Sequence, residues 1–170
     1  MARATTPFSG ITVLDFSRYL PGGYATQVLA DLGATVIKCE DTGAGDFMRH
    51  DYPTMGNGIS YYITALGRNK KSVSLNLKDQ EVVDWFLKMA KEADVIVESF
   101  RPGVTKKLGI DYETINKINP RIIYCSISGY GAEDPRSKKA QHDLNMQATS
   151  GYLSVNHGGT SPLHLCSIFL

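Results

Sequence analysis

The stretch GITVLDFSRYLPGGYATQVLADLGATVIKCE, residues 10–40, contains one complete strand–helix–strand pattern. Residues 11–17 form an apolar, β-branched run that predicts a buried strand. A helical pattern follows over 22–34, with apolar residues on one stripe and Gly33 as the expected C-terminal stop. Residues 35–40 predict a second buried strand. Two buried strands joined by a helix are typical of a parallel sheet.

The same alternation continues through the rest of the chain. Short apolar or β-branched runs predict three further strands, at 70–77, 94–100 and 121–131. Apolar residues at helical spacing predict three further helices, at 78–93, 111–120 and 142–153. Asp79 is the expected N-cap of the first of these helices. The pattern predicts an α/β fold, a Rossmann-like parallel sheet with helices on both faces, in a single domain over 1–170.

Composition is that of an ordinary globular protein. The chain has 170 residues, of which 42% are hydrophobic and 21% charged, and its formal net charge is +1. A charge this close to zero gives no long-range attraction to nucleic acid, and no apolar run approaches the length of a membrane span. The three cysteines lie far apart, and the start has no secretory signal pattern. We therefore expect a cytoplasmic protein that uses no metal and binds neither nucleic acid nor membrane.

Ligands of open α/β sheets gather at the carboxyl ends of the strands. The candidate binding loops are therefore the segments that follow predicted strands, at 18–23, 41–58, 99–103 and 129–142. The first loop contains PGG at a helix start, which suits either a phosphate or carboxylate on free amides or a plain tight turn. Two basic clusters near these loops suit either an anionic ligand or a solvated surface: Arg68, Lys70, Lys71 and Lys78, and Arg101, Lys106 and Lys107.

His142 and Asp143 stand together at the predicted start of the last helix. Imidazole titrates near neutral pH, so His142 is a candidate general acid and base with Asp143 beside it. The alternative is that Asp143 caps the helix and His142 is a turn residue. The sequence contains no Gly-x-Ser-x-Gly, His-Glu-x-x-His or P-loop motif, so the mechanisms that depend on those motifs are not indicated.

Taken in order, four segments of the chain resemble one known family. Within residues 8–165 they read GITVLDFSRYLPGGYATQVLADLGATVIKCE, RNKKSVSLNLK, ADVIVESFRPGVTKKLGIDYETINKINPRIIYCSISGYG and HDLNMQATSG. This combination resembles the family III CoA-transferases, which include formyl-CoA, carnitine-CoA and bile-acid-CoA transferases and the related 2-methylacyl-CoA racemases. The resemblance implies a large Rossmann-like domain built from both ends of a chain more than twice this length. It also implies a smaller second domain and an interlocked homodimer.

The resemblance further implies that coenzyme A lies along the strand ends. By position in the family, CoA contacts fall on Tyr19, Leu20, Pro21, Lys38, Leu75, Lys78, Ser99, Phe100, Arg101 and Lys107. Asp41 stands where a transferase often has an arginine near the nucleotide, which weakens that contact or moves it to Lys38 or Arg49. Lys107 also stands where the family often has an arginine, and lysine supplies charge without a bidentate fork.

The segment around His142 distinguishes two activities within the family. In the racemases, a His-Asp-[Leu/Ile]-Asn segment supplies the histidine that moves the α-proton of the acyl-CoA, and HDLN at 142–145 matches it. The longer loop before RNKKS looks more like the transferases. The resemblance therefore implies a transferase that moves CoA from an acyl-CoA to a carboxylic acid through an enzyme-bound thioester. The alternative is a 2-methylacyl-CoA racemase that uses His142 as its acid and base.

The last ten residues, SPLHLCSIFL at 161–170, are predicted to form a strand. The resemblance implies a catalytic aspartate near 167–168, which would attack the acyl-CoA carbonyl. Ser167 and Ile168 stand there instead, and neither side chain supplies a carboxylate. We therefore expect a chain truncated before this aspartate, with little or no turnover on its own.

Overall fold

The computed structural model describes residues 6–155, which divide into two compact units between Ser128 and Gly129. The expected strand at 161–170, and the position of the expected aspartate within it, lie outside the described residues. The prediction of a single domain over 1–170 stays a prediction.

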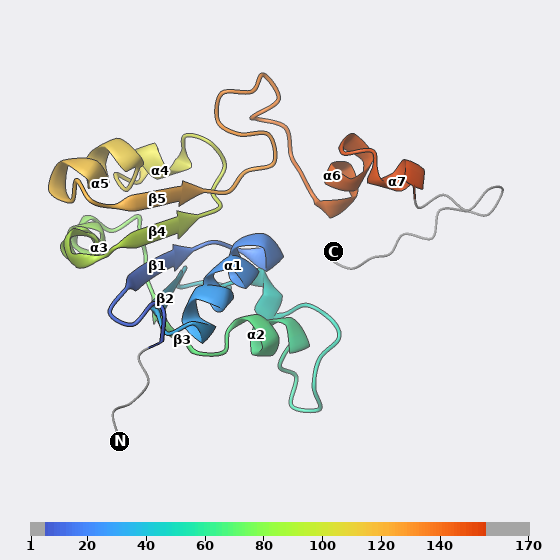
Figure 1. The fold of residues 1–170 in the computed structure, drawn as a ribbon, viewed down its shortest axis with the longest axis horizontal. Helices are drawn as coiled ribbons and strands as arrows, with labels where there is room; N and C mark the ends of the chain where they lie inside the picture. Colours follow the sequence, from blue (N-terminus) through green and yellow to red (C-terminus); the bar gives the residue numbers. More distant parts are fainter. Residues whose placement is uncertain (1–5, 156–170) are drawn as a thin grey trace. The chain divides into compact units, whose positions relative to one another are not determined.

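Five parallel strands form the sheet of the first unit (Figure 1). They are β1 (Thr12–Phe16), β2 (Thr35–Glu40), β3 (Lys70–Ser74), β4 (Val95–Glu98) and β5 (Ile123–Ser126). Their order across the sheet is β3-β2-β1-β4-β5, and each neighbouring pair is parallel. The order reverses between β1 and β4. Open α/β sheets bind their ligands outside the carboxyl ends of the strands at such a switch point.

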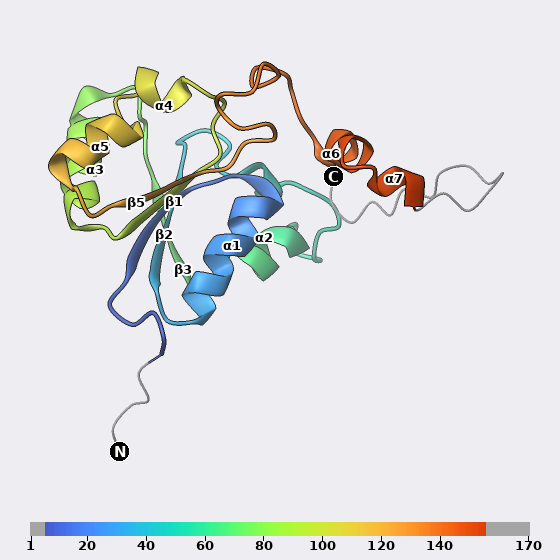
Figure 2. The same cartoon turned by 45° about the horizontal axis from the view of Figure 1, so that its top comes forward.

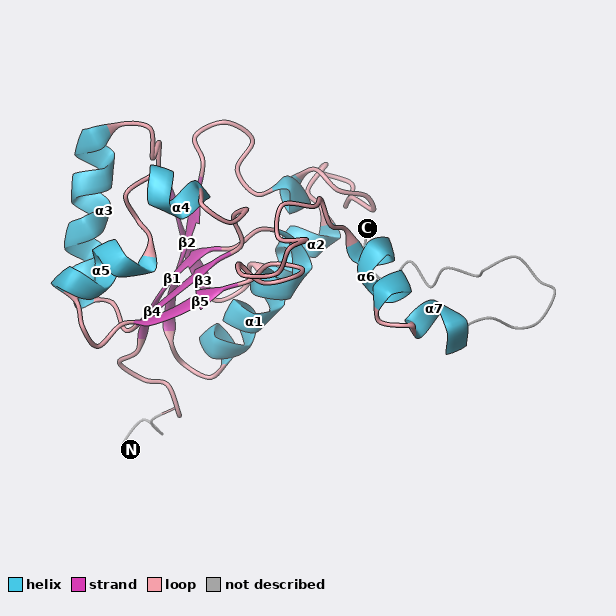
Figure 3. Ribbon diagram, turned by 90° about the horizontal axis from the view of Figure 1, so that it is seen from above, coloured by secondary structure: helices cyan, strands magenta, loops and turns pink. Residues whose placement is uncertain are grey.

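Helices cover both faces of this sheet (Figures 2 and 3). One face carries α1 (Tyr19–Asp31) and the short α2 (Tyr61–Leu66). The other face carries α3 (Gln80–Glu92), α4 (Val104–Lys107) and α5 (Tyr112–Ile118). A 3-10 turn, η1 (Phe47–Arg49), interrupts the long loop after β2. The predicted Rossmann-like α/β fold is therefore confirmed.

The two faces of the sheet enclose separate apolar cores. Successive strand residues point to opposite faces, so Val13 packs under α1 with Ala30, whereas Leu14 packs under α3 with Phe86. The core under α3 and α5 is the larger, and it includes the fully buried Phe86 and Ile115. Burial of a large apolar side chain stabilises the fold by about 1.5–3 kcal/mol.

The start of α1 differs from the sequence expectation. The helix begins at Tyr19 and not at Gly22, so PGG lies within its first turns. Gly22 is buried against the end of β1, and a Cβ there would lie 2.1 Å from the Cβ of Ser17. Only glycine allows this close approach of helix and strand. The end of α1 agrees with the prediction, because Gly33 follows it with a φ of 102°.

Other boundaries differ by a few residues. β3 ends at Ser74, three residues before the predicted end at 77. Asp79 caps α3 as predicted, since its Oδ1 accepts from the Glu81 amide at 3.0 Å. In the second unit, the predicted helix over 142–153 is two helices, α6 (Asp143–Thr149) and α7 (Tyr152–Val155). Gly151, with a φ of 79°, separates them.

None of the helices within residues 6–155 has the length and apolar character needed to cross a membrane. In the same residues, no three His, Cys, Asp or Glu side chains gather in a way that could hold a metal ion. The expectations that the protein uses no metal and binds no nucleic acid stay predictions.

Asn119 ties the end of α3 to the segment after α5. The side chain is buried, and its Nδ2 donates to the carbonyls of Ala90 at 2.9 Å and Ala93 at 2.7 Å. We expect Asn119→Ala to lower the free energy of unfolding by about 1–3 kcal/mol, because it leaves buried carbonyls without a donor. Urea denaturation measures this change.

The matched control is Asn116→Ala in α5, where the described residues contain no hydrogen bond to the side chain. We expect this control to change the free energy of unfolding by less than about 0.5 kcal/mol. Equal losses in the two variants would contradict the role given to the Asn119 amide.

Candidate functional site

A buried carboxylate, that of Asp15, organises the carboxyl end of β1. The residue has no exposed surface, and its Oδ1 accepts from the amide and hydroxyl of Ser17. Its Oδ2 accepts from Thr26 Oγ1 at 2.6 Å and from Lys70 Nζ at 3.3 Å. Burial lowers the pKa of Lys70, and the charge of Asp15 opposes that shift. These contacts join β1, α1 and β3 at one point.

Lys38 continues this set of charges into the long loop. Its side chain is 7% exposed, and Nζ lies 2.8 Å from Asp46 Oδ2 and 3.9 Å from Asp15 Oδ1. Nζ also donates to the carbonyl of Ser17. Asp46 in turn caps η1, since its Oδ1 accepts from the Met48 amide at 3.1 Å. Lys38 therefore holds the start of η1 against the turn between β1 and α1.

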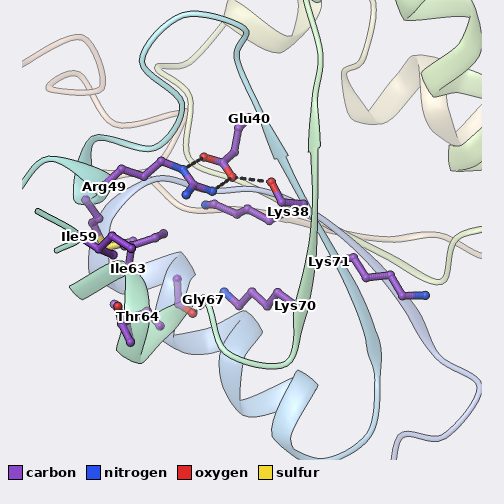
Figure 4. Close-up of a pocket in the computed structure, with 13 residues that line it drawn as sticks. Lys38, Glu40, Arg49, Ile59, Ile63, Thr64, Gly67, Lys70 and Lys71 are labelled. Atoms are coloured by element: carbon purple, nitrogen blue, oxygen red, sulfur yellow. Dashed lines mark hydrogen bonds and ion pairs between the residues drawn. The ribbon is translucent and has the colours of Figure 1, made fainter. Parts of the chain in front are cut away.

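Glu40 and Arg49 hold the other end of η1 (Figure 4). Arg49 Nε donates to Glu40 Oε2 at 2.7 Å, and Ser72 Oγ donates to Glu40 Oε1 at 2.8 Å. The Asp46 amide also donates to Glu40, at 2.9 Å. The hydrogen bonds from Arg49 lower the pKa of Glu40 to about 2. This carboxylate is therefore charged and fully engaged near neutral pH.

One cavity, which we call the Lys70 cavity, lies beside these groups. It has a volume of about 300 Å³, and Gly23, Met48, Ile63, Leu66 and Lys70 are among its lining residues. The close-up shows Lys70 and Lys71 extending to opposite sides of β3 (Figure 4). Lys70 Nζ is already engaged by Asp15, by the Gly23 carbonyl at 2.8 Å and by Thr26 Oγ1 at 2.7 Å. Its charge therefore supports the fold.

A second cavity, which we call the Phe100 cavity, lies at the carboxyl ends of the strands. It has a volume of about 180 Å³. Its lining residues come from the ends of β1 and β2, the β3–α3 connection, and the segment after β4: Phe16, Arg18, Cys39, Glu40, Asp41, Leu75, Asn76, Leu77, Lys78, Phe100 and Leu108. This is the edge of the sheet where the fold is expected to place a ligand.

The Phe100 cavity has both apolar and polar lining residues. The rings of Phe16 and Phe100 lie 6.2 Å apart, and burial raises the pKa of the Cys39 thiol to about 12. The thiol is therefore uncharged at neutral pH. Apolar and aromatic side chains with a few polar groups are typical of sites for small organic ligands. The apolar lining suits a flat aromatic group better than a charged one.

An ion pair lies among the polar lining residues. Arg18 Nη2 is 2.7 Å from Asp41 Oδ2, and the two side chains are 34% and 42% exposed. The Arg18 guanidinium also lies over the Phe47 ring, 5.1 Å from its centroid. The Arg18 amide donates to Ser99 Oγ at 2.8 Å. The pair therefore joins the segments that follow β1 and β2, and Ser99 joins them to the end of β4.

The structure brings together part of the set predicted to contact CoA. Leu75, Lys78 and Phe100 line the Phe100 cavity. Ser99 accepts from Arg18 beside it, and Arg101 is exposed on the following turn. Four others lie in the first turn of α1 or in α4: Tyr19, Leu20, Pro21 and Lys107. Their contacts with CoA stay predictions.

Lys38 is placed differently from the others. It lines the Lys70 cavity, and its ammonium group is held by Asp46 and Ser17. Its direct contact with CoA stays a prediction.

His142 and Asp143 belong to the second compact unit. His142 is the N-cap residue of α6, is exposed, and makes no side-chain capping bond. Asp143 is the first residue of α6 and accepts from Gln147 Nε2. Their catalytic role stays a prediction.

Sequence reasoning missed several residues of the Phe100 cavity. Arg18 lies within the predicted binding loop at 18–23 but is not among the residues predicted to contact CoA, and Asn76 lies between two that are, Leu75 and Lys78. Leu108 follows α4, and no periodicity or motif in the sequence indicates its place in the cavity. Only the packing of α4 against the sheet brings it there.

The pKa of Glu40 predicts how stability changes with pH. Its folded value of about 2 lies below the usual 4.5, so the unfolded chain binds more protons between these values. The stabilisation from Glu40 is therefore present above about pH 4.5 and is lost as the pH falls toward 2. We expect Glu40→Gln to lower the free energy of unfolding at neutral pH and to flatten its decline over this range.

Denaturation at a series of pH values measures both effects. Glu92→Gln, at an exposed residue that ends α3, controls for the loss of one surface carboxylate. An unchanged slope in Glu40→Gln would contradict this account of the Arg49 contact.

Comparison with known proteins identifies close relatives. Residues 8–166 match the sequence model of CoA-transferase family III. The chain is 41% identical to acetyl-CoA:oxalate CoA-transferase of Acetobacter aceti, over 97% of this chain and 44% of that protein. It is 43% identical to human succinyl-CoA:glutarate CoA-transferase, over 88% of this chain and 34% of that protein.

A solved structure agrees with these matches. A CaiB/BaiF family protein from Brucella suis superposes with a TM-score of 0.82 at 36% identity, over 88% of this chain and 40% of that one. The chain thus spans less than half the length of these relatives. The resemblance stated from the sequence is confirmed: this chain belongs to CoA-transferase family III.

Proposed function

We propose that the first unit binds the CoA part of an acyl-CoA, with the adenine ring in the Phe100 cavity. The observation that carries this proposal is the position of that cavity, at the strand ends, with Phe16 and Phe100 in its lining and Lys78 beside them. At about 180 Å³ it is smaller than the roughly 300–1,000 Å³ usual for a whole small-molecule site. It therefore suits one part of a larger ligand.

The rest of CoA extends along the carboxyl edge of the sheet in this proposal. Lys78, Arg101 and Lys107 are exposed and supply positive charge for the phosphates. The pantetheine arm passes Ser99 and the first turn of α1, where Tyr19, Leu20 and Pro21 lie. Lys38 supports this site indirectly, because it holds η1 and the turn that precedes α1 in place.

We further propose that the protein moves CoA from an acyl-CoA to a carboxylic acid. Family membership and the names of the relatives support this activity. An interlocked homodimer and a cytoplasmic location belong to the same proposal. Racemase activity through His142 remains the alternative that the HDLN segment indicates. The Acetobacter aceti and human relatives named above are both CoA-transferases, so transfer is the function that we favour.

Isothermal titration of this chain with CoA tests the binding proposal. We expect Lys78→Ala to weaken CoA binding about tenfold, because a charge-assisted contact to a phosphate contributes about 1.5–3 kcal/mol. The effect should diminish at high salt, which screens exposed charges.

Lys88→Ala is the matched control, since Lys88 is an exposed lysine of α3 that does not line the Phe100 cavity. We expect it to keep the wild-type affinity. An absence of binding by the wild-type chain, or equal losses in the two variants, would argue against the proposed CoA site.

A further inference from the structure

The Arg18–Asp41 pair places opposite charges side by side in the Phe100 cavity. Their 2.7 Å contact is only partly buried, so a ligand can reach either partner. The other carboxylate of the lining, Glu40, is not free to take part, because Arg49 and Ser72 engage both of its oxygens. Asp41 is therefore the carboxylate that a bound nucleotide would meet.

Asp41 directly follows the last residue of β2. In dinucleotide-binding folds, an acidic residue at the end of the second strand accepts hydrogen bonds from ribose hydroxyls, whereas a nearby arginine accommodates a ribose phosphate. This chain presents both groups in contact with each other. Coenzyme A carries a phosphate on the 3′-oxygen of its ribose, and 3′-dephospho-CoA carries a free hydroxyl there.

We propose that Arg18 and Asp41 together determine how the chain discriminates between CoA and 3′-dephospho-CoA. Arg18 attracts the 3′-phosphate, and Asp41 repels it and accepts from a free hydroxyl. Because the two contributions oppose each other, wild-type affinities for the two ligands lie within about threefold. This inference rests on the proposed CoA site and concerns the ribose end of that same site.

The loop geometry makes the test specific. Asp41 Oδ1 accepts from the Gly43 amide at 2.9 Å, so the carboxylate is oriented by its own loop. Asp41→Asn keeps this acceptor, removes the negative charge and replaces Oδ2, which accepts from Arg18 Nη2, with an amide donor. The Arg18 amide, and not its side chain, donates to Ser99, so Arg18→Gln leaves that contact in place.

Isothermal titration of the wild-type chain and each variant with CoA and with 3′-dephospho-CoA tests the proposal. We expect Asp41→Asn to tighten CoA binding roughly five- to tenfold and Arg18→Gln to weaken it by a similar factor. Affinity for 3′-dephospho-CoA should change less than about twofold in Arg18→Gln and should not improve in Asp41→Asn. Glu92→Gln changes the net charge by the same amount as Asp41→Asn but lies in α3, so it should change the affinity for neither ligand.

A purely structural ion pair gives a different result, because loss of either partner would then change the affinities for both ligands in the same direction. If both substitutions weakened the binding of both ligands, or if each changed the affinities for CoA and 3′-dephospho-CoA equally, this inference would be overturned. The proposed CoA site would still be supported. If the wild-type chain bound neither ligand, the proposed function itself would fail. Thermal melting of each variant establishes that the affinities compare folded proteins.

Discussion

The buried carboxylate of Asp15 is the interaction on which the carboxyl edge of the sheet depends. A charged group without exposed surface is tolerated only where partners replace water. Asp15 has hydrogen bonds from Ser17 and Thr26 and an ion pair with Lys70. These partners belong to the turn after β1, to α1 and to β3. Satisfying one charge therefore brings three elements into a single arrangement.

The same arrangement extends outward and shapes the proposed ligand site. Lys38 links Asp15 to Asp46, and Asp46 begins η1. Residue Phe47 of that turn then lies under the Arg18 guanidinium and stacks on Tyr19, with ring centroids 5.6 Å apart. The groups proposed to meet the nucleotide are thus positioned by charges that do not themselves line the Phe100 cavity.

The pleat of β2 keeps these two roles apart. Lys38 and Cys39 are neighbours in sequence, but successive strand side chains point to opposite faces of the sheet. Lys38 joins the buried charges on the side of the Lys70 cavity. Cys39, with its raised pKa, contributes an uncharged thiol to the Phe100 cavity. A single strand therefore supplies both the charged support and part of the apolar lining of the site.

The sequence by itself determined the order and type of the main elements. The stop at Gly33 and the cap at Asp79 were also predictable, because hydrophobic spacing and capping are local properties. The short α2 and the division between α6 and α7 were not predicted.

The strand-end rule and the family resemblance located Leu75, Lys78 and Phe100, which line one cavity. Only the tertiary structure decided that Arg18 meets Asp41 and that Lys38 is engaged by Asp46. Arg18 and Asp41 lie on separate loops, and Lys38 lies in β2 whereas Asp46 lies in the loop that follows it. Their distances depend on how strands and turns pack, which no local pattern of residues specifies.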